Sequence, residues 1–185
     1  MHQDEYWQVF DKSGNPIPGE GWEAALDNPE KTGSDKIVGA ALIFLYRINE
    51  AGELEFLWQK RSDTVSRWPG EYDASAGGHI NLGESLIDAA VRESREEIGA
   101  NISTDDLKYM GSFMPRLTRL VWAYMVDYSG RPDDFHFDDN EVSEVRWVSY
   151  KDLDEFRKNY LKKPLAECNI VFEMIDEWLK MHGII

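Results

Sequence analysis

The chain has 185 residues, which suits one domain, or one domain with an extension, and allows a proper hydrophobic core. Hydrophobic residues make up 42% of the chain and charged residues 30%, as in ordinary globular proteins. The formal net charge of −15 excludes binding of nucleic acid over a broad surface, because such binding needs clustered Lys and Arg. An anionic ligand must therefore be met locally, by a few basic groups or by a metal ion.

Cysteine usage and hydropathy indicate the cellular compartment. The single cysteine, Cys168, excludes an internal disulfide, and its place in an amphipathic stretch predicts a buried small hydrophobe. No apolar run approaches the roughly 18 residues that a membrane span requires. The N-terminus lacks the basic and apolar regions of a secretory signal. We therefore expect a cytoplasmic protein without a membrane segment.

Residues 1–35 are polar and rich in Gly and Pro, and they predict a partly irregular N-terminal extension. Within it, Tyr6 to Phe10 could form a short strand and Asp11 to Asn15 a turn, with the remainder irregular. Regular structure is clearer from residue 36 onward, so we expect the domain over residues 36–185.

The domain is expected to open with a hairpin. Ile37 to Tyr46 is an apolar run rich in branched residues, which predicts a buried strand, and Glu53 to Gln59 follows a turn as its partner. A loop over residues 62–71 and a short strand from Tyr72 to Ala76 lead into Gly77 and Gly78.

A helix is predicted from about Glu84 to Ile98. Ser85 and Asp88 have the spacing of a capping box, and Gly99 is the expected stop. The stripe predicted to be buried on this helix consists of Ile87, Val91, Ser94 and Ile98, with Ala90 beside it.

The second half of the chain predicts more strands and then two helices. Strands and helices interleave, so an α/β (α+β) fold with a mixed sheet covered by helices is expected. The elements are strands over 107–114, 120–128 and 145–148, an acidic loop over 131–140, a short helix starting at 149–153, and a longer helix opened by Pro164 and ending near Gly183.

Three glutamates share one face of the helix that ends at Ile98. At about 100° per residue, Glu93 and Glu97 lie roughly 40° apart, and Glu96 lies roughly 60° away on the other side. Three carboxylates on one face repel one another unless a cation gathers them. Mg²⁺ is the usual cation for such hard oxygen ligands, and it is commonly shared with substrate phosphates.

The spacing around these glutamates resembles the signature of the Nudix hydrolase superfamily. That signature is Gly, five residues, Glu, seven residues, and then Arg-Glu-aliphatic-any-Glu-Glu-any-Gly-aliphatic. Seven identities fall in register: Gly78, Glu84, Arg92, Glu93, Glu96, Glu97 and Gly99. Two aliphatic packing positions depart from the pattern, since they hold Ser94 and Ala100.

The resemblance implies a Nudix-type α/β/α sandwich with a mixed sheet and a loop–helix catalytic motif. It implies that the carbonyl of Gly78 and the carboxylates of Glu93, Glu96 and Glu97 hold Mg²⁺, for which Mn²⁺ could substitute. Glu84 would reach a second metal ion or a water molecule. Arg92 is expected to orient carboxylates, because Asp88 and Glu96 lie four residues to either side of it.

Flanking residues resemble the branch of the superfamily related to isopentenyl-diphosphate isomerase. The matching segments are Phe10 to Asn15, Leu57 to Ser62, Trp68 to Gly70 and Asp73 to His79. Those isomerases carry an essential cysteine just before the glycine-histidine pair of this loop. Here the segment from Ala74 to His79 has no thiol, and Cys168 is far along the chain, so the sequence disfavours isomerisation.

For the remaining site residues, the sequence leaves alternative roles open. The late acidic loop offers a base to activate water, and Glu141 is our choice, although a solvated loop would look the same. Arg61, Lys60 and His79 could meet the phosphates of a substrate, and Arg67 lies close to them in sequence. A surface role for the basic pair, or a packing role for the histidine, is the alternative.

Two classes of function follow. The first is a Mg²⁺-dependent hydrolase that cleaves a diphosphate linkage in a nucleoside diphosphate derivative or another organic diphosphate. The second is a non-catalytic Nudix-like sensor that binds a nucleotide and regulates a partner. The expected partner of the first is a small-molecule diphosphate. A homodimer is compatible with the resemblance, because many relatives are dimers.

Overall fold

A long central strand, β3 (Ile37–Ile48), organises the fold of this computed structural model, which describes residues 6–26, 29–138, 140–161 and 165–185. The predicted apolar run is buried along nearly all of its length. Nine residues of β3, from Val38 to Tyr46, pair in parallel with β8 (Arg119–Asp127). Strands buried on both faces need such continuous apolar sequence, which explains the absence of alternation.

On its other edge, β3 has three antiparallel partners. Residues 37–38 pair with β1 (Tyr6–Phe10), residues 40–43 pair with β6 (Ala76–His79), and residues 46–48 pair with β4 (Leu54–Arg61). Strands β3 and β4 therefore separate after their turn, and β6 lies in the space between them.

The remaining strands extend the mixed sheet. Strand β4 pairs with β5 (Tyr72–Asp73) and with β9 (Val142–Ser149), both antiparallel. Strand β7 (Lys108–Arg116) pairs with β8. The single strand expected from Tyr72 to Ala76 is thus two strands, and the glycine pair lies inside the second of them.

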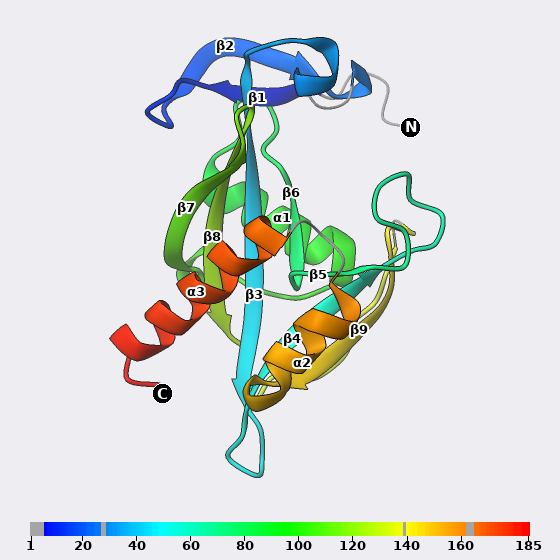
Figure 1. The fold of residues 1–185 in the computed structure, drawn as a ribbon, viewed down its shortest axis with the longest axis vertical. Helices are drawn as coiled ribbons and strands as arrows, with labels where there is room; N and C mark the ends of the chain where they lie inside the picture. The colour runs from blue at the N-terminus through cyan, green and yellow to red at the C-terminus, as the bar shows by residue number, and fades with distance from the viewer. Residues whose placement is uncertain (1–5, 27–28, 139, 162–164) are drawn as a thin grey trace.

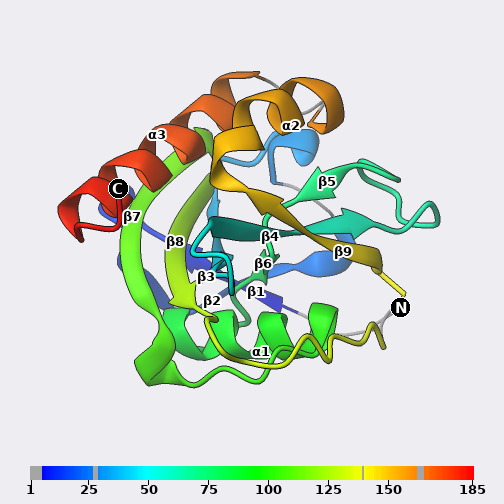
Figure 2. The ribbon, with the colours of Figure 1, turned by 90° about the horizontal axis from the view of Figure 1, so that it is seen from below.

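Helices cover both faces of the sheet, as Figure 2 shows. Helix α1 (Leu86–Ile98) lies on one face, and α2 (Leu153–Tyr160) and α3 (Leu165–Met181) lie on the other. This is the predicted helix–sheet–helix sandwich. Short 3-10 turns, η1 (Ala24–Leu26), η2 (Pro29–Thr32), η3 (Thr104–Asp106) and η4 (Tyr150–Asp152), join the larger elements. None of the helices in these ranges is both long and apolar enough to cross a membrane.

The N-terminal extension is more regular than predicted. Strand β1 (Tyr6–Phe10) forms as expected, but residues 16–23, expected to be irregular, form β2 (Pro16–Glu23) and pair with β1. Strand β2 is mostly exposed and contains Pro, Gly and Glu, so its sequence carries no strand periodicity. Backbone pairing with β1 therefore defines this strand. Figure 1 shows the hairpin at one end of the molecule.

Helix α1 differs from the prediction at its start and in one buried position. It begins at Leu86 rather than Glu84, because Ser85 caps it and accepts a hydrogen bond from Asp88 N. Ile87, expected in the buried stripe, is 42% exposed. The helix packs on the glycines of β6, and its inward face consists mostly of small residues. The large side chain of Ile87 therefore does not fit between the helix and the sheet and stays exposed to solvent.

The two departures from the family pattern lie in the core, as packing positions should. Ser94 is fully buried, and its hydroxyl donates to the carbonyl of Ala90 at 2.8 Å. Ala100 is also buried. Asp139, Pro164 and the side chain of Cys168 lie outside the described residues, so the predictions for them stay predictions.

Candidate active site

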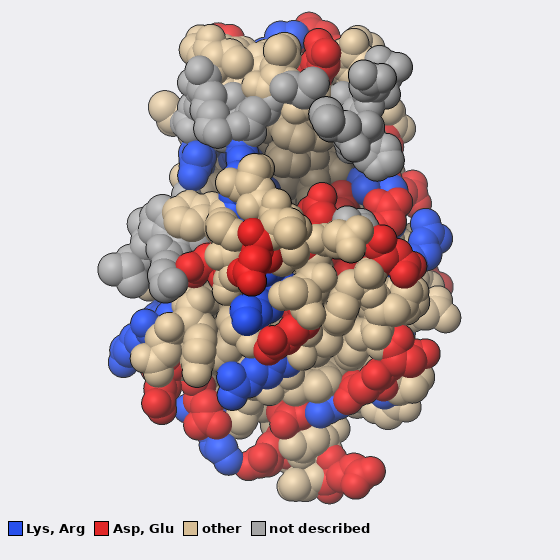
Figure 3. Space-filling model, turned by 90° about the vertical axis from the view of Figure 1, so that its right-hand side faces the viewer, with Lys and Arg blue, Asp and Glu red and all other residues tan. Residues whose placement is uncertain are grey.

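A large cleft of about 1540 Å³ opens between β6, the second half of α1 and the N-terminal hairpin. Its lining brings together residues far apart in sequence, from Trp7 to Phe172. Figure 3 shows the surface hollowed below the hairpin end, with Lys and Arg on both sides of the hollow and Asp and Glu beneath it. The predicted Glu93, Glu96, Glu97 and Glu141 all line this cleft.

The carboxylate of Glu93 lies directly against Gly78. A Cβ at this position would overlap that carboxylate, so the Glu93 side chain would have to shift. Gly77 is equally confined, since its Cβ would lie 2.8 Å from the carbonyl oxygen of Ala41. The glycine pair therefore lets β6 pass between β3 and α1.

Arg92 holds three of the glutamates; of the two neighbours expected from the sequence, Glu96 is among them, while Asp88 bonds to Ser85 instead. Its Nε and Nη2 donate to the two oxygens of Glu84 at 2.8 and 2.9 Å. Its Nη1 donates to Glu93 Oε1 at 2.8 Å and to Glu96 Oε2 at 3.0 Å. Although burial lowers the pKa of Arg92, the bond to Glu84 and the charges of Glu93 and Glu96 raise it overall. The guanidinium of Arg92 therefore stays charged and balances the negative charges of these glutamates.

Glu97 is bound separately from the other glutamates. Its Oε2 accepts from Gly77 N at 2.7 Å and from Gln59 Nε2 at 3.1 Å, and the residue is only 3% exposed. Burial, followed by the charge of Glu93, raises the pKa of Glu97 well above its ordinary value. The sequence placed the glutamate face at the rim of the core, so this degree of burial is greater than expected.

Glu93 also lies in an environment that opposes its charge. Burial raises its pKa to about 7, the guanidinium of Arg92 opposes the shift, and Glu96 and Glu141 add to it. The charge of Glu141 also contributes to the raised pKa of Glu97. Glu141, on the loop before β9, is therefore close enough to act electrostatically on both buried glutamates.

The donor groups suit a hard cation, although they do not form a closed cage. In the described part of the chain, no three carboxylate, imidazole or thiol groups converge tightly enough to hold an ion by themselves. The hydrogen bonds above engage one oxygen each of Glu93, Glu96 and Glu97. The other oxygens, together with the nearby carbonyl of Gly78, are the kind of ligand that Mg²⁺ prefers. A cation there would also offset the cost of burying like charges.

The three predicted substrate contacts have different positions. Arg61 lines the cleft, and its Nε donates to the carbonyl of Arg67 at 3.0 Å. His79 also lines it and stacks on Trp7, with ring centroids 3.6 Å apart. Lys60 does not line the cleft; its side chain lies 3.8 Å from Glu144. Neighbouring residues of a strand point to opposite faces, so Lys60 and Arg61 diverge.

Sequence reasoning missed several cleft residues. Gln59 binds Glu97 from β4, and its own Oε1 is buried without a partner among the described residues. Trp7 comes from the extension, and Arg116 and Arg119 come from the turn between β7 and β8. Each lies far in sequence from the glutamate helix, and only the pairing of β3 with β1, β6 and β8 brings them together. The Arg-x-x-Arg spacing at a strand turn was the one available signal.

The comparisons with known proteins agree with this geometry. The family model described as the NUDIX domain matches residues 37–168. An uncharacterised Nudix hydrolase from Listeria monocytogenes is 30% identical over 165 residues, covering 84% of this chain and 95% of that protein. Nudix hydrolase 3 from Arabidopsis thaliana is 28% identical over 142 residues, or 71% of this chain. The aligned part spans only 18% of that longer protein.

Solved structures share the fold. DR0079 from Deinococcus radiodurans aligns with a TM-score of 0.62 at 23% identity, over 89% of this chain and 96% of that one. The Caenorhabditis elegans Ap4A hydrolase, solved as a binary complex, aligns with a TM-score of 0.55 at 23% identity, over 78% and 98%. At such identities the likeness bears on fold alone. With the family match over more than half of its length, the chain belongs to the Nudix family and is a Nudix hydrolase, an enzyme that acts on pyrophosphate bonds.

Proposed function

We propose that this hydrolase is Mg²⁺-dependent and cleaves a diphosphate linkage in a nucleoside diphosphate derivative or another organic diphosphate. The observation that carries the proposal is the packing of the Glu93 carboxylate against Gly78, with Glu96 and Glu97 beside it on the same cleft. Buried carboxylates that raise one another's pKa call for a cation.

The metal ligands would be the carboxylates of Glu93, Glu96 and Glu97 and the carbonyl of Gly78, with Glu84 nearby. When bound, Mg²⁺, or Mn²⁺ in its place, supplies charge neutralisation at the diphosphate and lowers the pKa of a water molecule. The protein's own contribution is orientation. Arg92 fixes Glu84, Glu93 and Glu96, while Gly77 and Gln59 fix Glu97.

Glu141 is our proposed general base. It lines the cleft, it is exposed, and its charge acts on Glu93 and Glu97 from across the site. A carboxylate in that position can accept a proton from a water molecule in the cleft. We propose that Arg61 and His79 contact the phosphates of the substrate. Lys60 does not line the cleft, and we propose that its positive charge assists substrate binding indirectly.

The size and lining of the cleft support a substrate larger than the diphosphate alone. Beyond the glutamates, the cleft continues along apolar and aromatic side chains that include Phe44, Trp58 and Phe172. The C. elegans neighbour is named as an Ap4A hydrolase, which supports a nucleotide derivative.

Isomerase chemistry is disfavoured by the cleft itself. The wall from Ala76 to His79 carries no thiol, and the described lining of the cleft contains no cysteine. We therefore propose that the chain is related by descent to the isopentenyl-diphosphate isomerase branch but does not share its isomerase activity.

The direct test is a phosphate-release screen over diverse diphosphates, with Mg²⁺ and with chelator. We expect at least one substrate to be cleaved, with activity lost on chelation and reduced at least a hundredfold in Glu97→Gln. The matched control is Glu155→Gln on α2, an exposed glutamate far from the cleft, which should retain full activity. Full activity in Glu97→Gln would overturn the metal assignment. Tight nucleotide binding without turnover or metal requirement would favour the sensor.

We also propose a homodimer, with β7 as its interface. Among the strands that the structure describes, β7 pairs only with β8, and Tyr109, Met114 and Leu117 on or next to it are exposed. Sedimentation should give twice the chain mass, and Leu117→Asp should give a monomer. A monomeric wild-type protein at high concentration would contradict this.

A further inference from the structure

The loop between β8 and β9 passes the end of α1 on its way to the cleft. Figure 2 shows this loop beside α1, on the face of the sheet opposite to α2. Phe135 and Phe137 of the loop pack against the buried core on the α1 face. The loop ends at Glu141, the general base proposed above, directly before β9 begins at Val142. Its course therefore links the glutamate helix to the residue that is proposed to activate water.

His136 is a point at which this loop contacts the end of α1. Its N–H donates to the carbonyl of Ile98, the last residue of α1, at 3.2 Å. Its imidazole lies against Gly99, since a Cβ at this glycine would be 2.2 Å from the ring atoms Cε1 and Nδ1. Gly99 ends the helix with a φ of 67°, which favours glycine by itself, and the close ring is a second reason for glycine there. Both the backbone and the ring of His136 thus rest on the helix end.

Glu141 is held at a different element. Its carbonyl accepts from Ser62 N, directly after β4, at 2.7 Å. Asn140, just before it, has a φ of 61°, a left-handed conformation that Asn adopts more readily than most other residues. The base is therefore anchored to the end of β4 on one side, and His136 anchors the same loop to α1 on the other.

The side chain of His136 belongs to the cleft and contributes little to the core. It lines the cleft together with Asp138 and Glu141. Its Nε2 lies 3.6 Å from Asp138 Oδ2, and the side chain is 57% exposed. Replacement of an exposed side chain rarely changes stability by a large amount. A variant at His136 should therefore fold, which makes its contact with α1 open to a direct test.

The distance between Glu141 and the glutamates of α1 matters for the proposed chemistry. The charge of Glu141 contributes to the raised pKa of both Glu93 and Glu97, so it acts across the cleft on two proposed metal ligands. A base must lie within hydrogen-bond reach of the water that it activates, and a misplacement of about 1 Å can cost about a hundredfold in rate. The ligands are on a helix and the base is on a loop, so the reaction depends on how the loop and the helix are held together.

We propose that His136 is a positioning residue: by resting on Gly99 at the end of α1, it sets the distance between Glu141 and the glutamates that are proposed to hold the metal. This inference rests on the proposed hydrolase function and on Glu141 as its base. It assigns no proton transfer to His136, which acts only through Glu141. Gly99 then has a role beyond ending the helix, because it also gives the imidazole its place.

The first test is a double-mutant cycle on the full chain, with Mg²⁺ and a diphosphate that the screen above identifies. We expect His136→Ala to lower kcat about tenfold and to leave KM within about twofold, because binding of the substrate does not need the base. In the residual activity of Glu141→Gln, the same change should cost less than about twofold, since the residue through which His136 acts is already disabled. His136→Phe keeps a flat ring over Gly99 and should recover most of kcat.

A matched pair of glycines separates the ring contact from backbone strain. Gly99→Ala and Gly183→Ala each place a methyl group at a glycine that follows a helix, with φ of 67° and 64°. The methyl group at Gly183 meets open space, whereas the one at Gly99 overlaps the imidazole, which must turn away. We expect kcat to fall about fivefold in Gly99→Ala and to stay within about twofold in Gly183→Ala. His182→Ala removes an imidazole next to α3, outside the cleft, and is the matched control for His136→Ala.

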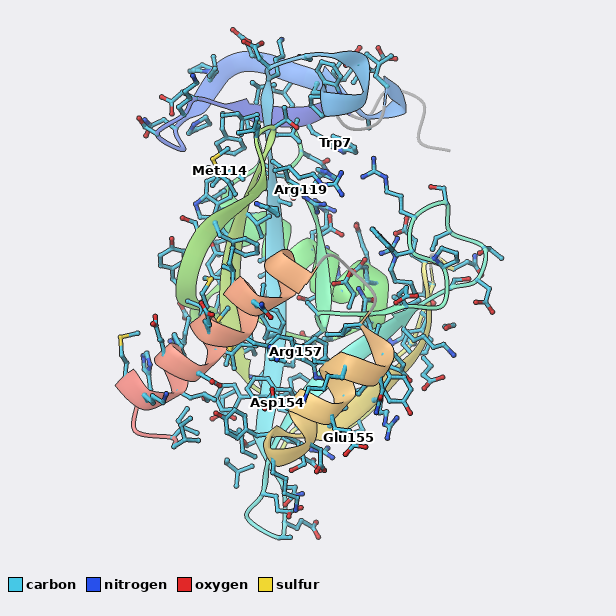
Figure 4. All side chains as sticks on the ribbon, in the orientation of Figure 1. Trp7, Met114, Arg119, Asp154, Glu155 and Arg157 are labelled. Carbon is cyan, nitrogen blue, oxygen red and sulfur yellow. The ribbon has the colours of Figure 1, made fainter. Side chains whose placement is uncertain are left out.

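Amide exchange, measured by mass spectrometry, reports the contact without any substrate. We expect faster exchange in the peptide that contains Glu141, both in His136→Ala and in Gly99→Ala, with an unchanged melting temperature in His136→Ala. Helix α2 is the internal reference, because it packs on the other face of the sheet, where Figure 4 labels Glu155. Exchange in α2 should stay as in the wild type.

The outcomes separate this inference from the proposed function. If His136→Ala lowers kcat equally in the wild type and in Glu141→Gln, or leaves kcat unchanged, the positioning role is overturned while the hydrolase stands. If Glu141→Gln keeps full kcat, the base assignment falls and the positioning role falls with it, although metal-dependent turnover remains. If no diphosphate is cleaved, the hydrolase proposal itself is overturned together with both roles.

Discussion

Arg92 donates hydrogen bonds to both carboxylate oxygens of Glu84, at 2.8 and 2.9 Å. These bonds link the segment between β6 and α1 to the middle of α1. The loop end is held as well, because Glu84 Oε2 accepts from Asn81 N at 2.9 Å. The side chains of Arg92 and Glu84 are only 19% and 16% exposed. This pair therefore fixes the loop that carries Gly78 relative to the helix that carries the other glutamates.

Replacement of Arg92 should damage both stability and activity. Arg92→Ala leaves several buried carboxylates without their counter-charge, and we expect a loss of about 3 kcal/mol in the free energy of unfolding. Urea unfolding of the metal-free protein measures this loss. The control is Lys36→Ala, whose exposed ion pair with Glu20 should contribute less than about 1 kcal/mol. Equal losses in the two variants would contradict the role given to Arg92.

Gly78→Ala should lower activity by displacing Glu93. The new methyl group would overlap the Glu93 carboxylate, so the side chain or the loop must move. We expect at least a tenfold loss of kcat/KM. Gly52→Ala is the contrasting variant: it has open space but a φ of 79°, so it should cost about 1 kcal/mol of stability and leave kcat/KM unchanged. A fully active Gly78→Ala enzyme would refute the close approach.

The chemistry of this helix could be predicted from sequence better than its packing. Side-chain type and register pointed to Glu96 as a partner of Arg92, but they also pointed to Asp88, which bonds to Ser85 instead, and they did not point to Glu84 or Glu93. The exposure of Ile87 and the burial of Glu97 could not be predicted, because both depend on how closely α1 approaches Gly77 and Gly78. A periodic pattern gives the direction of a side chain but not the distance to the neighbouring strand.

Trp7→Ala should loosen the glycine loop. The ring of Trp7 lies parallel to that of His79, with an interplanar angle of 6°, and such a stack contributes about 1 kcal/mol beyond buried area. We expect a lower melting temperature and faster amide exchange in residues 79–83, measured by mass spectrometry. Trp7→Phe keeps an aromatic face and should lie between alanine and wild type. Unchanged exchange in Trp7→Ala would show that the stack does not hold the loop.

Asp106 provides a pH-dependent contribution to stability outside the cleft. Its hydrogen bond with Arg131 is the largest cause that lowers its pKa, to about 2. Because the folded-state pKa is below the unfolded one, the contribution is present above about pH 4 and disappears as pH falls toward 2. Asp106→Asn should cost about 1 kcal/mol at pH 6, after allowance for solvent screening, and almost nothing near pH 2. A cost that is independent of pH would contradict this assignment.

The arginines of the cleft illustrate what a single sequence conceals. Arg116 and Arg119 share an Arg-x-x-Arg spacing across the turn between β7 and β8, but no periodicity or motif links them to Arg67. Their meeting depends on the parallel pairing of β3 with β8, which joins residues about 80 positions apart. The same holds for Trp7, which a reading of residues 1–35 as a partly irregular extension placed nowhere near a site.

The hairpin that carries Trp7 is tied to the loop after β6 by three further bonds. Gln8 N donates to Ile80 O at 2.8 Å, Leu82 N donates to Tyr6 O at 2.8 Å, and Gly83 N donates to Gln8 Oε1 at 3.1 Å. The family match begins only at residue 37. The β1–β2 hairpin that holds this loop lies upstream of the shared motif. Two relatives with identical glutamate helices can therefore differ in how firmly the same loop is held. Exchange of this segment between relatives offers a way to change the activity of such enzymes without altering any of the proposed metal ligands.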